Sequence, residues 1–216
     1  MNKLIMICSA ALLAVGLSGC AINQVAPKDM SAFTTAAPAS ILVVPIVNHS
    51  LDVDAPNYVL TTLPIPLAEK GYYVYPVNTV KVVLEQEGLY EGEAVQQQPT
   101  EKLAAMFGAD AVLYVKINQW DAKYAVITTS VTVDFDYRMV SKNGVEIFNE
   151  NKRVVYSPES NLDGSPLLVL IDAVVNSALA RAKPNYMPLT REANAAVFNE
   201  GPNALPDGPY RRTRIN

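Results

Sequence analysis

Hydrophobic positions along this chain first predict three buried strands. Residues 41–47 and 111–117 are almost continuous apolar, β-branched runs, which is typical of strands covered on both faces, and 72–77 predicts a further strand rich in tyrosine. Because Pro45 cannot donate a ladder hydrogen bond, the first strand should have an irregularity or a sheet margin there.

Apolar residues at helical spacing, bounded by glycine or proline, predict the helices between and after these strands. The expected helices cover 54–70, a short segment between Thr79 and Gly88, 100–107, 167–183 and 190–198. Residues 88–99 contain two glycines and Pro99 and predict a loop. Alternation of strands with helices is a βαβ-like order, and 167–183 should cover one sheet face.

A different pattern, with a period of two, predicts a β-hairpin in the second half. From 126 to 140 polar residues alternate with Val131, Val133, Phe135, Tyr137 and Met139, so one face should be buried and the other wet. Ser141-Lys142-Asn143-Gly144 predicts the turn and 145–156 the partner strand. We therefore expect one α/β (α+β) domain over 41–200, with a mixed sheet of about five strands, a C-terminal hairpin and a covering C-terminal helix. Residues 201–216 predict a flexible tail.

The N-terminal residues predict an export signal and a lipid anchor. Lys3 precedes a hydrophobic run of fourteen residues, 4–17, which is shorter than the roughly 20 that span a bilayer, and the run ends in Leu17-Ser18-Gly19-Cys20. This tetrapeptide resembles the lipobox of bacterial lipoproteins, which implies cleavage after residue 19 and acylation of Cys20, for example with palmitate. An ordinary signal peptide or an uncleaved anchor is the alternative. Residues 20–40 predict a flexible tether. In the lipoproteins that the motif resembles, an aspartate after the cysteine signals retention in the inner membrane, so the resemblance with Ala21 at this position implies the outer membrane, with the domain facing the periplasm.

Composition narrows the range of functions. The formal net charge is −4, so no basic surface for nucleic acid is expected. Of the two cysteines, Cys8 would leave with the signal and Cys20 would carry lipid, which leaves no thiol in the mature domain. No phosphate loop, zinc spacing or nucleophile elbow occurs. We therefore expect a protein that is not an enzyme, without cofactor, metal site or catalytic residue.

Two polar clusters allow alternative interpretations. His49, the only histidine, precedes Asp52 and Asp54 and could form a weak cation or phosphate site, but a solvated turn that caps the next helix is favoured. Asp134 and Asp136, with Arg138, share one strand face and could bind a hard cation, although a solvent-facing row is again favoured.

Aromatic residues at strand ends are the candidate partner-binding residues. They are Tyr72, Tyr73, Tyr75, Trp120 and Tyr124, with Tyr90 and Tyr114 nearby in the sequence. Such residues are enriched in protein interfaces, and they equally form the rim of a core. Both interpretations remain open from the sequence alone.

Several stretches resemble one family of bacterial lipoproteins. The chain is similar to the neisserial surface-antigen-type lipoproteins, a family long catalogued as a domain of unknown function. The similar stretches are the lipobox, residues 60–77 with Gly-Tyr-Tyr-Val, residues 107–115 with Gly-Ala-Asp-Ala, Trp120, and Leu-Pro-Asp-Gly-Pro-Tyr at 205–210. The resemblance implies a fold like the N-terminal domain of TolB and the lipoprotein activators of penicillin-binding proteins. It also implies protein partners among envelope lipoproteins, including a CsgG-like one, or cell-wall machinery. It implies no catalytic residues.

The expected function is therefore a non-enzymatic interaction component of a cell-envelope assembly or secretion complex, anchored in the membrane through Cys20. One alternative is an activator of a peptidoglycan synthase. A second is a weak ligand-binding or hydrolytic enzyme that uses His49. Homo-oligomerisation through an exposed strand or the C-terminal segment is also open.

Overall fold

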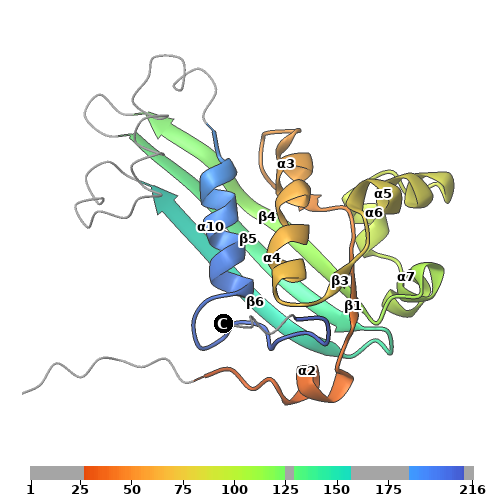
Figure 1. Cartoon of the computed structure of the whole chain (residues 1–216). Coiled ribbons are helices and arrows are strands. Elements are labelled where there is room, and N and C mark those ends of the chain that lie inside the picture. The colour runs from red at the N-terminus through yellow and green to blue at the C-terminus, as the bar shows by residue number, and fades with distance from the viewer. Residues whose placement is uncertain (1–26, 125–128, 157–184, 212–216) are drawn as a thin grey trace, which may run out of the picture.

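A mixed β-sheet with helices on both faces forms the protein (Figure 1). The computed structural model describes residues 27–124, 129–156 and 185–211. The strands are β1 (Ser40–Val43), β2 (Val47–Asn48), β3 (Tyr73–Val74), β4 (Ala111–Tyr124), β5 (Thr129–Ser141) and β6 (Glu146–Tyr156). The described helices are α2 (Ser31–Ala36), α3 (Ala55–Thr62), α4 (Pro64–Glu69), α5 (Val77–Gln86), α6 (Gly92–Gln96), α7 (Thr100–Phe107) and α10 (Met187–Phe198).

The sheet has the order β3-β1-β4-β5-β6, and β2 also pairs with β4. β1 is parallel to both β3 and β4, while β4, β5 and β6 are antiparallel neighbours. At the β5–β6 turn Gly144 adopts a φ of 78° and its amide donates to Ser141 O at 2.9 Å. The predicted α/β (α+β) class, the βαβ-like first half and the hairpin are confirmed, with six strands in the sheet.

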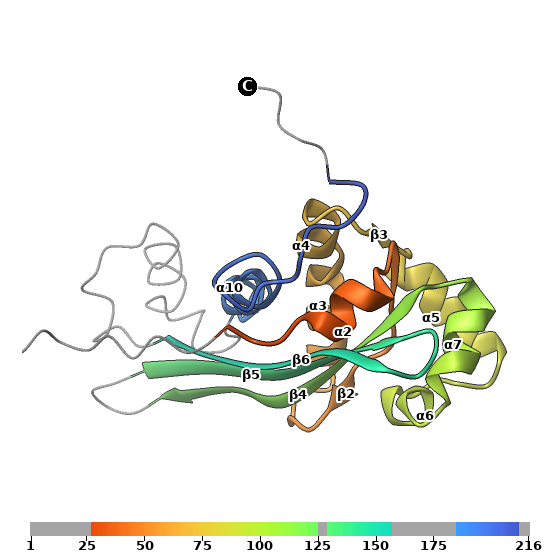
Figure 2. The same cartoon turned by 90° about the horizontal axis from the view of Figure 1, so that it is seen from below.

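Two hydrophobic cores lie on opposite faces of the sheet. Ile41 and Val43 of β1 face the core under α3, α4 and α10, whereas Leu42 and Val44 face the core under α5 and α7. Figure 2 shows α10, α4 and α2 on one side of the sheet, with α6 toward the other. Because side chains alternate along a strand, burial on both sides demands a continuous apolar run, as in 41–47.

Prolines divide two of the predicted elements. The predicted strand 41–47 is separate strands β1 and β2 around Pro45, and the predicted helix 54–70 is two helices, α3 and α4, with Pro64 as the first residue of α4. The loop prediction for 88–99 is wrong in part. Its central residues form α6, because Val95 is fully buried in the second core and Gln96 Nε2 donates to Val115 O at 3.0 Å.

Folded structure extends beyond 41–200 at both ends. Within the predicted tether, α2 buries Phe33, whose ring meets that of Tyr72 edge-on at 6.1 Å. Within the predicted tail, Leu205 is buried in the first core. Three of the predicted segments lie outside the described residues: the signal and lipobox within 1–26, the helix 167–183, and the last residues of the tail, 212–216. The described helix that covers β5 and β6 is α10.

Candidate functional site

The predicted aromatic residues fall into two structurally different groups. Tyr72 and Trp120 are almost fully buried. The Tyr72 hydroxyl donates to Pro206 O at 2.6 Å, and burial, with a smaller effect of the nearby Asp207 charge, raises the pKa of this phenol. Trp120 donates through Nε1 to Asp52 Oδ2 at 3.2 Å. These two side chains stabilise the core, so a partner does not reach them.

Tyr73 and Tyr75 form the accessible group, at the edge strand β3. Tyr73 is 52 % exposed and meets the ring of Tyr75 edge-on at 5.0 Å. Tyr75 packs in turn against Phe107 of α7, with the ring centroids 6.2 Å apart. Tyr124 is the last residue of β4, and its side chain lies outside the described residues.

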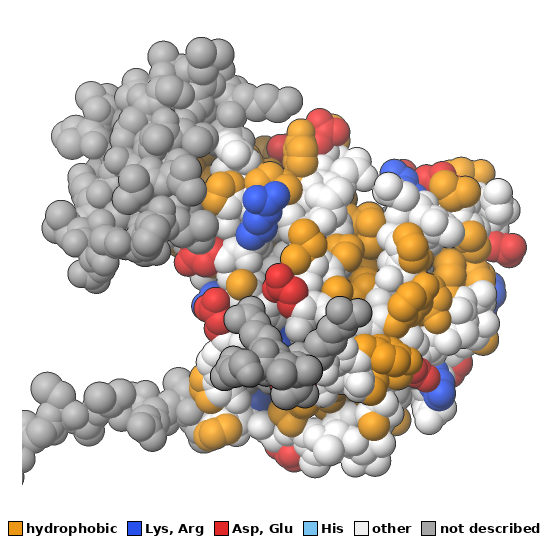
Figure 3. Space-filling model, viewed as in Figure 1, with side chains coloured by type: hydrophobic (Ala, Val, Ile, Leu, Met, Phe, Trp, Pro, Cys, Tyr) orange, Lys and Arg blue, Asp and Glu red, His pale blue; other side chains and the backbone are white. Residues whose placement is uncertain are grey.

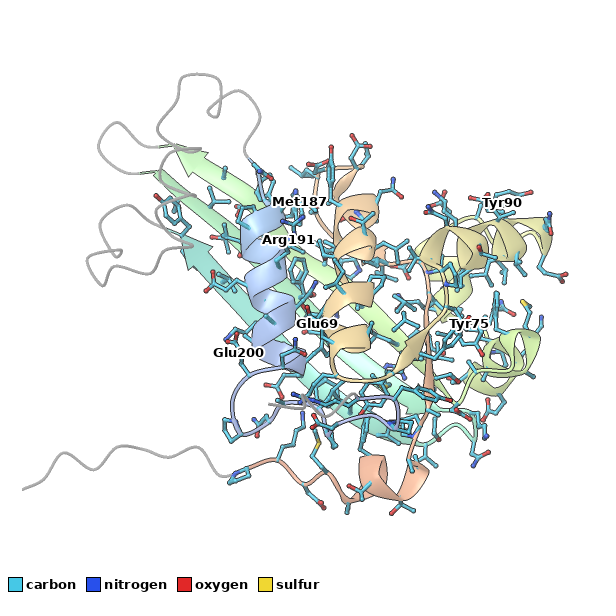
Figure 4. All side chains as sticks on the ribbon, in the orientation of Figure 1. Glu69, Tyr75, Tyr90, Met187, Arg191 and Glu200 are labelled. Atoms are coloured by element: carbon cyan, nitrogen blue, oxygen red, sulfur yellow. The ribbon has the colours of Figure 1, made fainter. Side chains whose placement is uncertain are left out.

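Exposed hydrophobic side chains gather on the face that contains β3. Figure 3 shows hydrophobic surface around β3 and between α5 and α7. Tyr90 is 66 % exposed, and Ile65 of α4 and Val82 of α5 are also exposed, by 61 % and 52 %. Tyr75 and Tyr90 lie on this same side of the molecule (Figure 4). Apolar surface grouped in this way is typical of interaction sites.

A groove of about 430 Å³ opens at one end of this face. It lies where the parallel strands β1 and β2 end, a common ligand position in α/β sheets. Its apolar and polar walls are formed by Pro45, Ile46, Val47, Asn48, Val53, Pro56, Asn57, Leu60, Lys81, Tyr90, Glu91, Gly92 and Glu93. Val53 and the neighbouring Leu51 are both highly exposed. We call Tyr73, Tyr75 and Tyr90, together with this groove, the aromatic face.

The structure separates His49 from the acids that precede α3. His49 Nε2 lies 3.5 Å from Glu93 Oε1, and both side chains are more than half exposed. Asp52 is held instead by Trp120 and accepts the Asp54 amide at 2.9 Å. Asp54 is the residue before α3 but makes no side-chain cap. No nucleophile and base arrangement is assembled around His49 by these contacts.

The acidic row on β5 is a cross-strand network. Asp136 pairs with Lys116 at 2.8 Å and accepts from Asn151 at 2.7 Å, while Asp134 accepts from Asn151 at 2.9 Å. Burial raises the pKa of Asp136, but hydrogen bonds from Lys116, Asn151 and Asn118 outweigh it and hold the pKa below its usual range. Both carboxylates are already bonded to Lys116 or to the side-chain amide of Asn151.

In 27–124, 129–156 and 185–211, no three or more His, Cys, Asp or Glu side chains are grouped so that they could hold a metal ion. Among those same residues, no helix combines the length and apolar character that crossing a bilayer requires.

Comparison with known proteins identifies the family. Residues 28–210 match the family described as "Putative lipoprotein GNA1162-like". The chain belongs to the GNA1162-like family. It is 38 % identical over 169 residues to "Putative lipoprotein NMB1124/NMB1162" of Neisseria meningitidis serogroup B, and the match covers 77 % of each chain. The crystal structure of lipoprotein GNA1162 from Neisseria meningitidis aligns with a TM-score of 0.55 and 37 % identity, over 64 % of this chain and 96 % of that one.

Two of the stretches that resemble the GNA1162-like family pack on each other. Gly208 N donates to Lys70 O at 2.7 Å and Tyr210 N donates to Gly71 O at 3.0 Å, so residues 205–210 lie along the turn before β3. Gly71 has a φ of 90°, and a Cβ there would overlap the backbone of Arg211. A Cβ on Gly208 would overlap Gly71 O. We call residues 205–211 the C-terminal strap.

The third stretch, Gly-Ala-Asp-Ala, positions a carboxylate that joins three segments of this GNA1162-like protein. Asp110 Oδ2 accepts the amides of Ala39 and Ser40 at 3.1 Å each, and Oδ1 pairs with Lys142 Nζ at 2.9 Å. Burial raises the pKa of Asp110, but Lys142, Ser40 and Ala39 together hold it below its usual range. Asp110 thus connects the start of β1, the start of β4 and the hairpin turn.

Sequence reasoning missed most of the groove. Leu51 and Val53 are apolar residues inside a polar, turn-forming segment, and that contrast is the signal that could have indicated them. Nothing local indicated that Ile65 and Val82 would be exposed, because both occupy ordinary positions in helical patterns.

Proposed function

We propose that this GNA1162-like protein is an outer-membrane lipoprotein, acylated on Cys20, whose periplasmic domain docks to partner proteins of a cell-envelope assembly or secretion complex without catalysing a reaction. The aromatic face is the proposed docking surface. The observation that carries the proposal is the groove of about 430 Å³ with the exposed Val53 and Tyr90 in its wall, on the side of the molecule where Tyr75 also lies.

Three features support a docking role. The aromatic face combines exposed tyrosines, which are enriched in interfaces, with a groove of the size that accepts side chains of a partner. Glu91 and Glu93 at the rim favour a partner with basic residues beside its apolar ones. Family membership supports the lipid anchor, which would keep the domain at the membrane where envelope complexes assemble.

The anchor is tested by fractionation. We expect Cys20→Ala to move the protein from the membrane fraction to the soluble fraction, because the two or three acyl chains that hold a lipoprotein would be absent. Cys20→Ser should behave identically. A variant protein that stays in the membrane fraction would contradict acylation at Cys20.

The docking surface is tested by photo-crosslinking in cells that express the full chain. A photoreactive phenylalanine derivative placed at Tyr90 should capture a specific envelope protein. The same group at Tyr210, which is 63 % exposed against 66 % for Tyr90, is a matched control on the C-terminal strap. Capture from both positions alike, or from neither, would refute the aromatic face as the docking surface. A captured peptidoglycan synthase would favour the activator role over an assembly role.

A further inference from the structure

A second concave site lies on the sheet face opposite α10, and it adjoins α6 on another side from the groove of the aromatic face. The depression has a volume of about 400 Å³ and lies beside α6, over β4, β5 and β6. The side chains that carry its chemistry are Gln96, Tyr114, Lys116, Arg138 and Asn149. Antiparallel register places Tyr114 opposite Arg138, with Asn149 opposite Arg138 on the other side.

Arg138 is held in place without using its hydrogen-bond donors. Its guanidinium carbon lies 4.4 Å from the centroid of the Tyr114 ring, and the Tyr114 hydroxyl is 2.8 Å from Thr100 Oγ1, which fixes the ring. Among the described residues, Arg138 has no carboxylate within ion-pair distance and no hydrogen-bond acceptor. Arg138 lines the depression, and its five N–H donors have no acceptor among these residues.

The side chains that line the depression include two cations, Lys116 and Arg138, and one carboxylate, Asp136. Asp136 is the carboxylate that lines the depression, and it is already paired with Lys116 at 2.8 Å and bonded by Asn151. Arg138 is thus the uncompensated charge of the site. Gln96 uses its amide nitrogen on Pro45 O and Val115 O, and Asn149 uses its own on Glu146, which keeps both amides at fixed positions beside the guanidinium.

We infer that this depression binds a carboxylate of an acidic peptide segment of another protein, with Arg138 as the anchoring residue. The planar guanidinium of Arg138, held over the Tyr114 ring, has two parallel donors that match the two oxygens of a carboxylate. We call this the Arg138 site.

The experiment titrates the whole soluble chain, with Cys20→Ser, by NMR and calorimetry. The probes are a short acetylated and amidated peptide with two glutamates, the same peptide with glutamines, and inorganic phosphate. The glutamate peptide should shift the side-chain amide signals of Gln96 and Asn149, and the glutamine peptide should not. Arg138→Gln should weaken binding roughly tenfold or more, because charge-assisted bonds are lost.

Two further variants distinguish specific recognition by the Arg138 guanidinium from nonspecific electrostatic attraction. Arg138→Lys keeps the charge but loses the planar fork, so binding should weaken nearly as much as with Arg138→Gln. Arg153→Gln removes an exposed arginine opposite Asp134 on the same strand pair, outside the depression, and should leave affinity within about twofold. The inference is overturned by equal losses in the Arg138 and Arg153 variants, by equal binding of the glutamine peptide, by tighter binding of phosphate, or by no binding of the glutamate peptide. None of these outcomes bears on docking through the aromatic face, because neither Arg138 nor Arg153 lines its groove.

Discussion

A buried chain of three polar side chains should control how α10 is held on the sheet. The Tyr137 hydroxyl of β5 donates to Asn194 Oδ1 of α10 at 2.7 Å, and Asn194 Nδ2 donates to Thr62 Oγ1 of α3 at 2.8 Å. All three side chains are buried, and Thr62 is itself satisfied through its bond to Val59 O at 2.7 Å. Burial, with a smaller effect of the Asp134 charge, raises the pKa of Tyr137, so the phenol stays protonated and donates.

Replacing Asn194 by alanine leaves the Tyr137 hydroxyl buried without an acceptor. An unsatisfied buried donor costs about 1–3 kcal/mol, and the second lost bond adds about 1 kcal/mol, so we expect the free energy of unfolding to fall by about 3 kcal/mol. For a domain of this size the melting temperature should fall by roughly 6–12 °C. Urea unfolding and thermal melts followed by circular dichroism measure both quantities on the soluble Cys20→Ser chain.

A double-mutant cycle tests the cause. Tyr137→Phe combined with Asn194→Leu removes both polar partners and keeps the volume filled, so the double variant should be more stable than Asn194→Ala alone. Thr62 keeps its bond to Val59 O in every variant. If the cost of Asn194→Ala is below about 1 kcal/mol, or if the effects at 137 and 194 simply add, the reasoning is refuted.

The remaining predictions concern the C-terminal strap, Asp110 and the aromatic face. Gly71→Ala should lower the free energy of unfolding by about 2–4 kcal/mol in a urea titration, because the new Cβ meets the Arg211 backbone. Gly88→Ala is the control, since Gly88 has a similar positive φ but open space around it, and this change should cost only about 1 kcal/mol. Equal costs of the two changes would contradict the packing of the C-terminal strap on Gly71. The lowered pKa of Asp110 means that its stabilisation is fully present above the ordinary aspartate pKa and is lost as the pH falls through the folded-state value. Asp110→Asn should therefore lower the urea midpoint at pH 7 but much less at pH 2, and an equal loss at both pH values would argue against an ionised role. Tyr73→Ser should reduce partner capture from position 90 severalfold, with an unchanged urea midpoint, since this ring is half exposed.

Periodicity predicted most elements of the sheet because the relevant signal is local. Strict alternation from Val131 to Met139 describes a strand with one apolar face, and all five of those apolar side chains are buried. Proline and glycine also act locally, which is why breaks at Pro45 and Pro64 and the turn at Gly144 follow from residue type. The short α6 does not follow from residue type, because its helical character depends on Val95 reaching a core made by distant segments.

Which residues are accessible at the candidate sites depended on tertiary packing, whereas the strands and turns followed from local sequence. Tyr72 and Tyr73 are adjacent tyrosines with the same local preference, yet one is buried and the other is half exposed. Side chains of neighbouring strand residues point to opposite faces, and which face is covered depends on α2 and the C-terminal strap. From residue type alone, Tyr72 and Tyr73 were therefore both predicted as partner-binding residues, although only Tyr73 is accessible to a partner.

By itself the sequence determined the family, the class of fold, the hairpin and the lipobox resemblance at Cys20, because each is expressed in a short run of residue types. Only the tertiary structure decided that residues 205–211 pack on Gly71, that Trp120 is structural, and that Arg138 lies over Tyr114 with its donors free of the described residues. The physical reason is that the residues in these contacts are far apart in the sequence. Tyr72 and Pro206 are bonded across 134 positions, and contacts of that kind exist only after the sheet has brought distant segments together.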